Sequence, residues 1–269
     1  MLYKIVFYLF DLFPRLKRWF WKKWYTLFTQ KVENPNLKFM NYGYFGLERS
    51  LTLDAEDENN RFTIQLYHHV ASQVNLKGLK VLEVGSGRGG GAAYIAKYLS
   101  PERMEGVDIS PSAIALCNKN YKQENLTFQQ GDAERLPFDD NFFDVVINVE
   151  SSHCYASMEK FLNEVKRVLK PNGAFLFCDL RKAKRMDDLL KKLDTDGLKL
   201  ITKKDITSNV IKASKIMTTE RLNAISKFKY AWLRKILESF AAVEGSKMYK
   251  SFTSGDSKYI SAHCQNYKP

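Results

Sequence analysis

The spacing of hydrophobic and polar residues changes repeatedly along the chain from about residue 59 onward. Runs of consecutive apolar residues are typical of strands buried on both faces of a sheet, whereas apolar residues three or four positions apart indicate helices. The predicted strands are residues 80–84, 104–109, 126–130, 143–149, 174–180, 197–206 and, as a final edge strand, 258–265. The predicted helices are residues 59–75, 91–99, a segment from Pro111, 158–170, 183–195 and most of 206–240, with a turn at 171–173. This alternation predicts an α/β fold, with a seven-stranded and mostly parallel sheet that is covered by helices on both faces.

The first 30 residues form a distinct segment in which aromatic and basic residues are mixed. Between residues 15 and 28, six large apolar side chains recur at helical spacing, and lysine and arginine fill most other positions. This pattern predicts an amphipathic helix that lies in a membrane interface. Half-burying such a set of side chains would contribute roughly 5–9 kcal/mol before ordering costs. The alternatives are a helix that packs on the protein's own core and, less favoured because the apolar side is too hydrophobic for a phosphate groove, a segment that binds nucleic acid.

Composition limits the remaining classes of function. The chain has 269 residues and a formal net charge of +12, which suits an anionic partner such as a membrane surface or an acidic small molecule. Its four cysteines form no Cys-x-x-Cys pair, so we expect no zinc site, no redox chemistry and no other metal. Cys117 and Cys178 fall in predicted core elements, which favours a reducing compartment such as the cytoplasm. No apolar run reaches the roughly 18 residues that a membrane-spanning helix needs.

A glycine-rich stretch, VLEVGSGRGGG at residues 81–91, joins the first predicted strand to the next helix. Glycine allows a sharp turn and a close approach of the backbone to a ligand, and the helix that follows offers free N–H groups. The stretch fits both the dinucleotide pattern G-x-G-x-x-G and a looser G-x-G-x-G pattern, and alone it is a weak signal. Glu83 would repel a pyrophosphate and suits a cationic group. Asp108 ends the second strand at the spacing expected of an acid that binds ribose hydroxyls.

Four strings, in this order and spacing, resemble those of the class I S-adenosylmethionine-dependent methyltransferases. They are EVGSGRGG (83–90), GVDIS (106–110), GDAERLPF (131–138) and RVLKPNG (167–173). The resemblance runs from about residue 80 to residue 180 and is looser toward the C-terminus. It implies a Rossmann-like fold and a sulfonium cofactor, S-adenosyl-L-methionine, in place of a nicotinamide.

The resemblance also implies roles for individual residues. The glycine loop should face the methionine and ribose portions of the cofactor, and Glu83 should lie near its amino group. Asp108 should bind both ribose hydroxyls, Asp132 should accept from the adenine amino group, and Asn148 should present its backbone to the methionine end. Two tyrosines in MNYGYFG (40–46) resemble an aromatic lid that closes over the sulfonium. The expected cofactor-binding residues are Tyr42, Tyr44, Glu83, Gly85, Ser86, Gly87, Gly89, Asp108, Ile109, Asp132, Ala133 and Asn148.

Each of these residue types also has an ordinary structural use. Asp108 could belong to a helix cap and Asp132 to a turn, and the two tyrosines could be core aromatics. The presence of the whole motif set favours the binding roles.

The acceptor side of the site is expected where the fourth and fifth strands end. His153, in NVESSHCY (148–155), follows the fourth predicted strand, and Asp179 lies near the end of the fifth. Asp179 could orient the imidazole of a His153 base or act as the base itself, and Glu150 is a rival carboxylate in the same loop. A base would add roughly 10²–10⁴-fold to the rate if the acceptor must lose a proton. The alternative for His153 is a structural or surface histidine.

The region 149–181 looks most like a subgroup that O-methylates fatty acids and polyketide-type lipids, including the phthiotriolone and phenolphthiotriolone dimycocerosates methyltransferases. The resemblance implies transfer to a hydroxyl or carboxyl of a hydrophobic acceptor by a cytoplasmic enzyme that associates peripherally with a membrane. The expected organisation is an amphipathic membrane-surface segment (1–30), a connector and cofactor lid (31–75), and a methyltransferase domain (76–269) with acceptor-lid helices at about 205–240. Two alternatives stay open: methylation of carbon or nitrogen, as in sterol, quinone or phosphobase methyltransferases, and a cofactor-binding or lipid-surface module without turnover.

Overall fold

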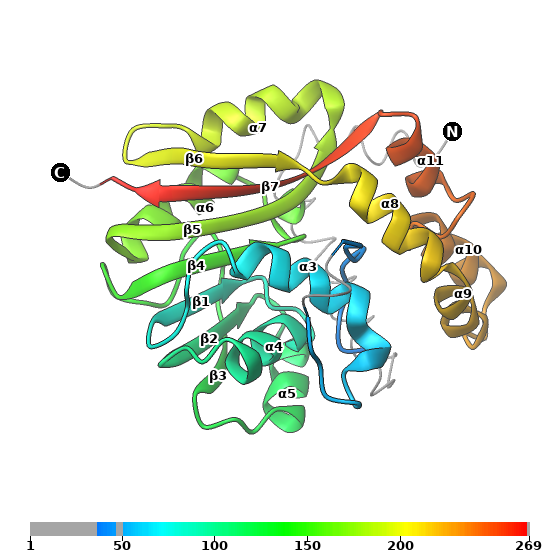
Figure 1. The fold of residues 1–269 in the computed structure, drawn as a ribbon, viewed down its shortest axis with the longest axis horizontal. Helices are drawn as coiled ribbons and strands as arrows, with labels where there is room; N and C mark the ends of the chain where they lie inside the picture. The colour runs from blue at the N-terminus through cyan, green and yellow to red at the C-terminus, as the bar shows by residue number, and fades with distance from the viewer. Residues whose placement is uncertain (1–36, 47–50, 268–269) are drawn as a thin grey trace.

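A computed structural model describes residues 37–46 and 51–267, and its central feature is a seven-stranded sheet in the order β3-β2-β1-β4-β5-β7-β6 (Figure 1). Strands β1 to β5 run parallel to one another, β7 is antiparallel to β5, and β6 is antiparallel to β7. The predicted fold class is therefore confirmed. The strands are β1 (Lys80–Val84), β2 (Arg103–Asp108), β3 (Leu126–Gln130), β4 (Phe143–Val149), β5 (Leu169–Lys182), β6 (Leu198–Asp205) and β7 (Ser257–Asn266).

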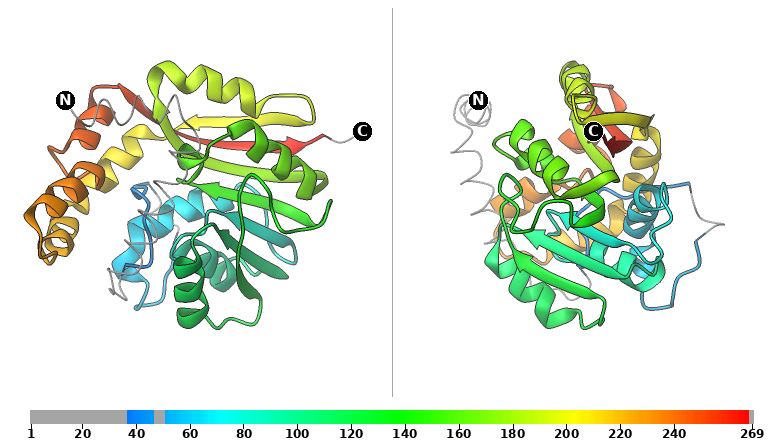
Figure 2. Two further views of the ribbon diagram at one scale, coloured as in Figure 1. Left: turned by 180° about the vertical axis from the view of Figure 1, so that it is seen from behind. Right: turned by 90° about the vertical axis from the view of Figure 1, so that its left-hand side faces the viewer.

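Helices cover both faces of the sheet, as two further directions of view show (Figure 2). On one face α3, α4 and α5 pack against strand residues such as Val81 and Ile147. On the other face α6 and α7 pack against their strand neighbours, such as Leu82 and Val146. Because consecutive strand residues point to opposite faces, a strand covered on both sides must be apolar at nearly every position. The α-helices are α3 (Arg61–Ala71), α4 (Gly90–Tyr98), α5 (Pro111–Asn120), α6 (Met158–Val168), α7 (Met186–Leu193), α8 (Thr207–Ile216), α9 (Thr218–Ser226), α10 (Ala231–Phe240) and α11 (Lys247–Thr253).

The turn expected at residues 171–173 is instead a bulge inside β5. Phe143 of β4 pairs with Leu169 of β5, and Val145 of β4 pairs with Ala174 of β5. The chain therefore advances two positions along β4 but five along β5, and the extra β5 residues bulge out of the sheet. Proline and glycine produce the irregularity that was predicted, but the chain rejoins the sheet on both sides of it.

Strand β7 and helix α11 also differ from the expectation. β7 is an interior strand between β5 and β6, not the edge strand, and most of its residues are buried. β6 forms the edge and exposes Lys199, Lys203 and Lys204, which suits a sheet edge because lysine discourages pairing with another chain. α11 was not predicted, because seven residues are too few to show helical periodicity.

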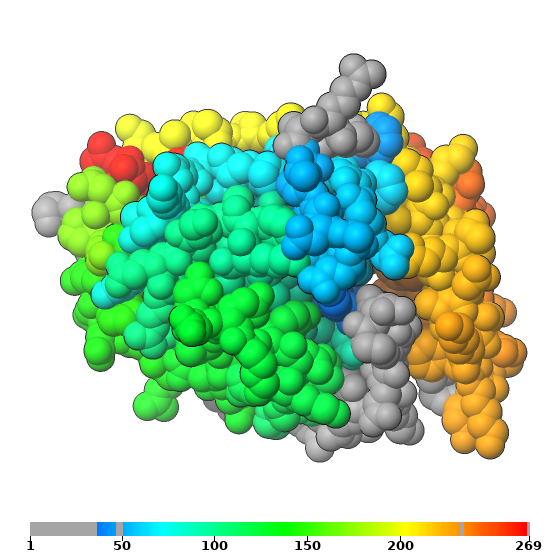
Figure 3. Space-filling view, turned by 60° about the horizontal axis from the view of Figure 1, so that its bottom comes forward, coloured from blue at the N-terminus to red at the C-terminus, as the bar shows by residue number. Residues whose placement is uncertain are grey.

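Helices α8, α9 and α10, which we call the lid, extend beyond the end of the sheet where the parallel strands finish (Figure 1). In the space-filling view the yellow and orange lid stands beside the blue and cyan surface of α3 and the segment before it (Figure 3). No helix within the described ranges has both the length and the apolar character needed to cross a bilayer. The amphipathic segment expected at residues 1–30 lies outside the described residues.

Candidate cofactor and acceptor site

The glycine loop after β1 is held against β2. Gly85, Gly87 and Gly89 have φ angles of 81°, 53° and 82°, in the left-handed region that residues with a side chain rarely adopt. The N–H groups of Gly85 and Ser86 both donate to the Val107 carbonyl, at 2.8 and 3.0 Å. Gly89 occupies the N-cap of α4. The predicted loop residues therefore lie together at the carboxyl end of β1.

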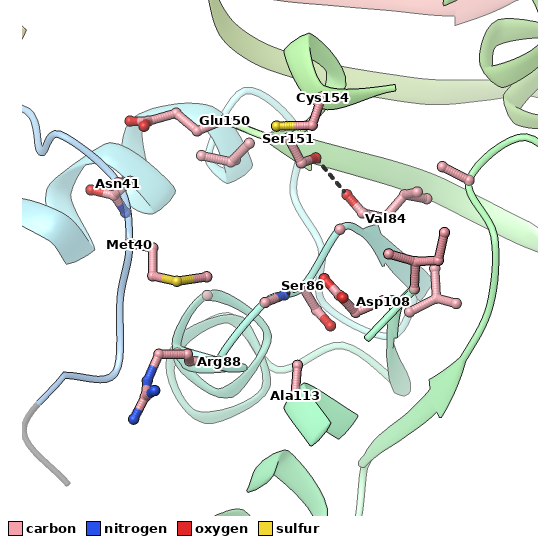
Figure 4. Close-up of a pocket in the computed structure, with 18 of the residues that line it drawn as sticks. Met40, Asn41, Val84, Ser86, Arg88, Asp108, Ala113, Glu150, Ser151 and Cys154 are labelled. Atoms are coloured by element: carbon pink, nitrogen blue, oxygen red, sulfur yellow. Dashed lines mark hydrogen bonds between the residues drawn. The ribbon is translucent and has the colours of Figure 1, made fainter. Parts of the chain in front are cut away.

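A cavity with about 1100 Å³ of empty space, part of it open to solvent, lies at the carboxyl ends of β1, β2 and β4 (Figure 4). Parallel α/β sheets bind their ligands at this edge. Residues 37–46, which we call the strap, form one wall of the cavity through residues such as Met40 and Asn41. The predicted cofactor-binding residues that line it are Gly85, Ser86, Gly87, Asp108, Ile109, Asp132 and Ala133.

Asp108, at the end of β2, directs its carboxylate toward the cavity (Figure 4). Its Oδ2 accepts from the Gly87 N–H and its Oδ1 from the Ser110 N–H, each at 2.9 Å. Burial raises the pKa of this carboxyl, and the two backbone N–H groups oppose that rise. Each oxygen of a carboxylate can accept a further hydrogen bond, so Asp108 suits a pair of neighbouring hydroxyl groups.

Glu83 is fully buried in β1, behind the cavity wall. The Tyr67 hydroxyl donates to its Oε1 at 2.6 Å, whereas Oε2 is buried and has no hydrogen-bond partner within the described ranges. Burial raises the pKa of Glu83 to about 7, although the Tyr67 hydroxyl and the backbone N–H of Ala92 act to lower it. A buried acceptor without a donor is costly, so this position favours a nearby cationic or donating group.

Asn148 in β4 lies behind the glycine loop and does not line the cavity. Its Nδ2 donates to the Val84 carbonyl at 2.8 Å and to Ser151 Oγ at 2.7 Å, with the Tyr155 hydroxyl 3.0 Å away. These contacts join the ends of β1 and β4. A contact between the Asn148 backbone and the methionine end of a cofactor stays a prediction.

We expect Gly85→Ala to destabilise the protein more than Gly245→Ala, although the two glycines have φ angles of 81° and 83°. A Cβ on Gly85 would lie 2.5 Å from Ser151 Cβ, whereas no described atom lies within 4 Å of a Cβ on Gly245. The left-handed strain common to both costs about 1–2 kcal/mol, and crowding at Gly85 adds roughly 1–3 kcal/mol. Urea unfolding measures both variants, and equal losses would contradict the crowding argument.

His153 and Asp179 form a direct pair at the carboxyl ends of β4 and β5. His153 Nδ1 lies 2.8 Å from Asp179 Oδ1, and the Ser152 hydroxyl and an Arg181 N–H group bind Oδ2 at 2.6 and 3.0 Å. Burial favours the neutral acid, but His153 and Arg181 hold the pKa of Asp179 well below its usual range. Burial likewise opposes charge on His153, yet Cys154 and Asp179 together raise the pKa of His153 to about 10. His153 is therefore largely an imidazolium at neutral pH.

Glu150 follows β4 directly and lines the cavity. It has a φ of 48°, a left-handed conformation that is uncommon for glutamate and often occurs at functional sites. Its Oε1 accepts from the Tyr42 N–H at 2.7 Å and from the Tyr259 hydroxyl. Burial raises the pKa of Glu150 to about 7, and both donors oppose the rise. Glu150 thus connects the strap to β4 and β7.

The two strap tyrosines pack on neighbouring elements and do not line the cavity. The Tyr42 hydroxyl donates to the Phe240 carbonyl at 2.8 Å, and its ring lies edge-on to Phe252. Tyr44 stacks on His69 with ring centroids 4.4 Å apart. A contact between either ring and a sulfonium stays a prediction.

Several residues that line the cavity were not identified from the sequence. Arg88 and Cys154 belong to strings that had already been noted, and their places in those strings could have indicated them. Met40 and Asn41 immediately precede the strap tyrosines. Tyr67 lies on α3, where no local pattern marked it.

Comparisons with known proteins identify the family and the fold. A family profile described as "Methyltransferase domain" matches residues 82–177. The chain is 37% identical over 240 residues to the phthiotriol/phenolphthiotriol dimycocerosates methyltransferase of Mycobacterium leprae, covering 89% of each chain. It is 39% identical over 189 residues to a fatty-acid O-methyltransferase of Mycolicibacterium smegmatis, covering 70% of this chain and 69% of that one. A solved structure of geranyl diphosphate C-methyltransferase from Streptomyces coelicolor, with S-adenosyl-L-homocysteine, has a TM-score of 0.65 at 14% identity, covering 91% of this chain and 97% of that one, which shows the fold alone.

Proposed function

The chain belongs to the S-adenosylmethionine-dependent methyltransferases, and we propose that it methylates a hydroxyl or carboxyl oxygen of a hydrophobic lipid or polyketide-like acceptor. The two relatives are named for phthiotriol and fatty-acid substrates, and one name specifies transfer to oxygen. The observation that carries the oxygen assignment is the His153–Asp179 pair beside the cavity. A hydroxyl acceptor must lose a proton, and a histidine oriented by a carboxylate can accept one. A carboxyl acceptor is already ionised near neutral pH and needs only to be positioned.

The residues of the cavity fit S-adenosylmethionine. The glycine loop lets the backbone approach a ligand closely, and Asp108 can accept hydrogen bonds from two ribose hydroxyls. In the proposal Asp132 accepts from the adenine amino group, and the buried carboxylate of Glu83 favours the ammonium group. The cofactor supplies a methyl group that its sulfonium charge has already activated, so positioning can account for up to roughly 7–11 kcal/mol of the barrier.

In the proposed reaction His153 accepts the acceptor's proton at Nε2, because Nδ1 faces Asp179. Asp179 fixes the orientation of the ring and stabilises the imidazolium that forms. His153 itself does not line the cavity, but the adjacent Cys154 does, and the His153 side chain is partly exposed, so the proposal requires the acceptor to reach the ring from beside the cavity. Since the pKa of His153 is raised to about 10, the neutral base is scarce at pH 7 and becomes abundant only at alkaline pH.

Glu150 is the rival base. It lines the cavity, and its pKa of about 7 suits proton transfer near neutral pH. Because Oε1 already accepts two hydrogen bonds, a proton from the acceptor would go to Oε2. A Glu150 base predicts a rate that levels off just above pH 7, whereas a His153 base predicts a rate that keeps rising toward pH 10.

Transfer to nitrogen or carbon is the second candidate reaction. It is favoured by the charge on His153, since an imidazolium is a poor base for an oxygen acceptor at neutral pH. A neutral amine, or a carbon acceptor that gives its proton to another group, would avoid this difficulty. The two reactions yield different products: an ester or ether in one case, and a methylamine or methylated carbon in the other.

We expect the purified full-length chain to transfer labelled methyl groups from S-adenosylmethionine to total lipids presented in vesicles that contain phosphatidylglycerol. Mass spectrometry should identify the products as methyl esters or ethers. Label on nitrogen or carbon would support the second candidate, and label that never leaves the donor would contradict lipid methylation. Sedimentation with the same vesicles tests membrane association, a proposal that rests on the sequence of residues 1–30.

A further inference from the structure

One peptide group of the strap lies between two opposite charges. The carbonyl of Asn41 accepts a hydrogen bond from an Arg221 Nη at 3.2 Å. The N–H of the same peptide group belongs to Tyr42 and donates to Glu150 Oε1 at 2.7 Å. Arg221 comes from α9 of the lid and Glu150 from the end of β4, so this peptide group connects the lid to the sheet.

The other contacts of Arg221 and Tyr42 hold the strap against the lid. The second Nη of Arg221 donates to the Ala241 carbonyl, just after α10, at 2.8 Å. The Ser214 hydroxyl of α8 donates to the Tyr42 carbonyl at 3.4 Å, and the Tyr42 hydroxyl donates to the last residue of α10. Each of the three lid helices therefore contacts Tyr42 or the peptide group before it.

Electrostatics make the orientation of this peptide group specific. A cation at the carbonyl and, above the Glu150 pKa of about 7, an anion at the N–H both stabilise the peptide dipole in one direction. Reversing the peptide would then place each charge against its own sign. Burial lowers the pKa of Arg221, and the charge of Glu150 opposes that effect. The charge of Glu150 thus favours the charged form of Arg221 across the peptide group.

The clamped peptide determines one wall of the cavity. Asn41 and the preceding residue, Met40, line the cavity directly. The side chain of Asn41 is committed elsewhere: its Nδ2 donates to the Thr63 carbonyl at 3.1 Å, and its Oδ1 accepts from the Gly43 N–H at 2.8 Å. The wall therefore has little freedom to adjust once the peptide group is fixed.

We propose that Arg221 is a positioning residue for cofactor binding, because it holds the Asn41–Tyr42 peptide group against Glu150. The affinity of the cavity for the cofactor then depends on the position of the lid. The inference rests on the proposed location of the cofactor in this cavity. Lid helices that close over an acceptor would then also tighten the strap over the cofactor.

Isothermal titration of the full chain with S-adenosylhomocysteine tests this role. We expect Arg221→Met to weaken binding about tenfold, since it removes the charge-assisted hydrogen bond to the Asn41 carbonyl and with it the contact of α9 with the strap. Arg221→Lys keeps the charge but cannot reach both carbonyls, so it should weaken binding only about threefold. If the methionine variant does not fold, the loss in the lysine variant still decides the question.

Arg234 provides the matched control. It is also a lid arginine, but its guanidinium contacts the carbonyls of Ser226 and Phe228 within the lid, at 3.5 and 3.4 Å. Arg234→Met should therefore leave S-adenosylhomocysteine affinity within about twofold of wild type. Unchanged affinity in both Arg221 variants, or an equal loss in Arg234→Met, would overturn the proposal. Failure of the wild-type chain to bind S-adenosylhomocysteine would instead refute the cofactor assignment of the cavity.

Discussion

Replacing His153 with alanine is expected to lower kcat for methyl transfer about a hundredfold or more while S-adenosylhomocysteine affinity stays within about twofold. For a hydroxyl acceptor the rate should fall because the substitution removes the group that takes the proton from the acceptor oxygen. Affinity should hold because His153 does not line the cavity. Asp179 keeps its bonds to Ser152 and Arg181 in the variant, so its buried charge remains compensated.

The pH dependence of the wild-type rate provides the second measurement of the same role. With the pKa of His153 raised to about 10, the neutral fraction grows as pH rises, so the rate should increase from pH 7 to about pH 10. Asp179→Asn removes an anion that favours the imidazolium, so the pKa of His153 should fall and the rise should move toward neutral pH. The maximal rate of that variant should be lower, because the imidazole loses the carboxylate that orients it.

His68 is the matched control for this substitution. It is a partly buried histidine on α3 whose Nδ1 contacts the Tyr94 hydroxyl at 2.6 Å. His68→Ala should leave kcat within about threefold of wild type, because His68 lies away from the ends of β4 and β5. A loss of less than tenfold in His153→Ala would remove the base assignment, and a rate that levels off near pH 7 would transfer it to Glu150.

The parts of the fold that the sequence predicted well are those that local burial dictates. β3 and β4 begin and end at the predicted residues, and Pro111 begins α5 as expected. Strand placement in the sheet is not a local property: the run at 258–265 was identified as a strand, but its interior position depends on pairing with β5 and β6. The bulge at residues 170–173 likewise follows from the pairing of β5 with β4.

The candidate site divides in the same way. Asp108 and the glycine loop could be located because their spacing along one strand–loop–helix unit is fixed by the turn they make. The partners of Glu150 could not be located from the sequence. Tyr42 and Tyr259 are 108 and 109 residues away from it along the chain, and they contact it only because of the tertiary fold. Arg221 was missed for this reason: an arginine in a basic, helical segment carries no sign that its guanidinium binds the strap.

Substitution of Asp108 by asparagine should weaken S-adenosylhomocysteine binding about a hundredfold or more. If the carboxylate accepts from two ribose hydroxyls, each charge-assisted hydrogen bond contributes roughly 1.5–3 kcal/mol. Asparagine has one acceptor oxygen, whereas Asp108 already uses both oxygens for the N–H groups of Gly87 and Ser110. The amide NH₂ group would therefore face one of these donors and displace the loop or the start of α5.

Asp144→Asn is the control that distinguishes a lost contact with the cofactor from the general cost of neutralising a carboxylate. It accepts from the Lys80 N–H at 2.9 Å and from Lys170 Nζ at 2.7 Å, at the opposite end of the sheet from the cavity. Calorimetry should find Asp144→Asn within about twofold of wild type in S-adenosylhomocysteine affinity, even if thermal unfolding shows some loss of stability. Near-normal binding by Asp108→Asn would mean that the ribose lies elsewhere. An equal loss in both variants would mean that the carboxylates act through stability, because only Asp108 faces the ligand.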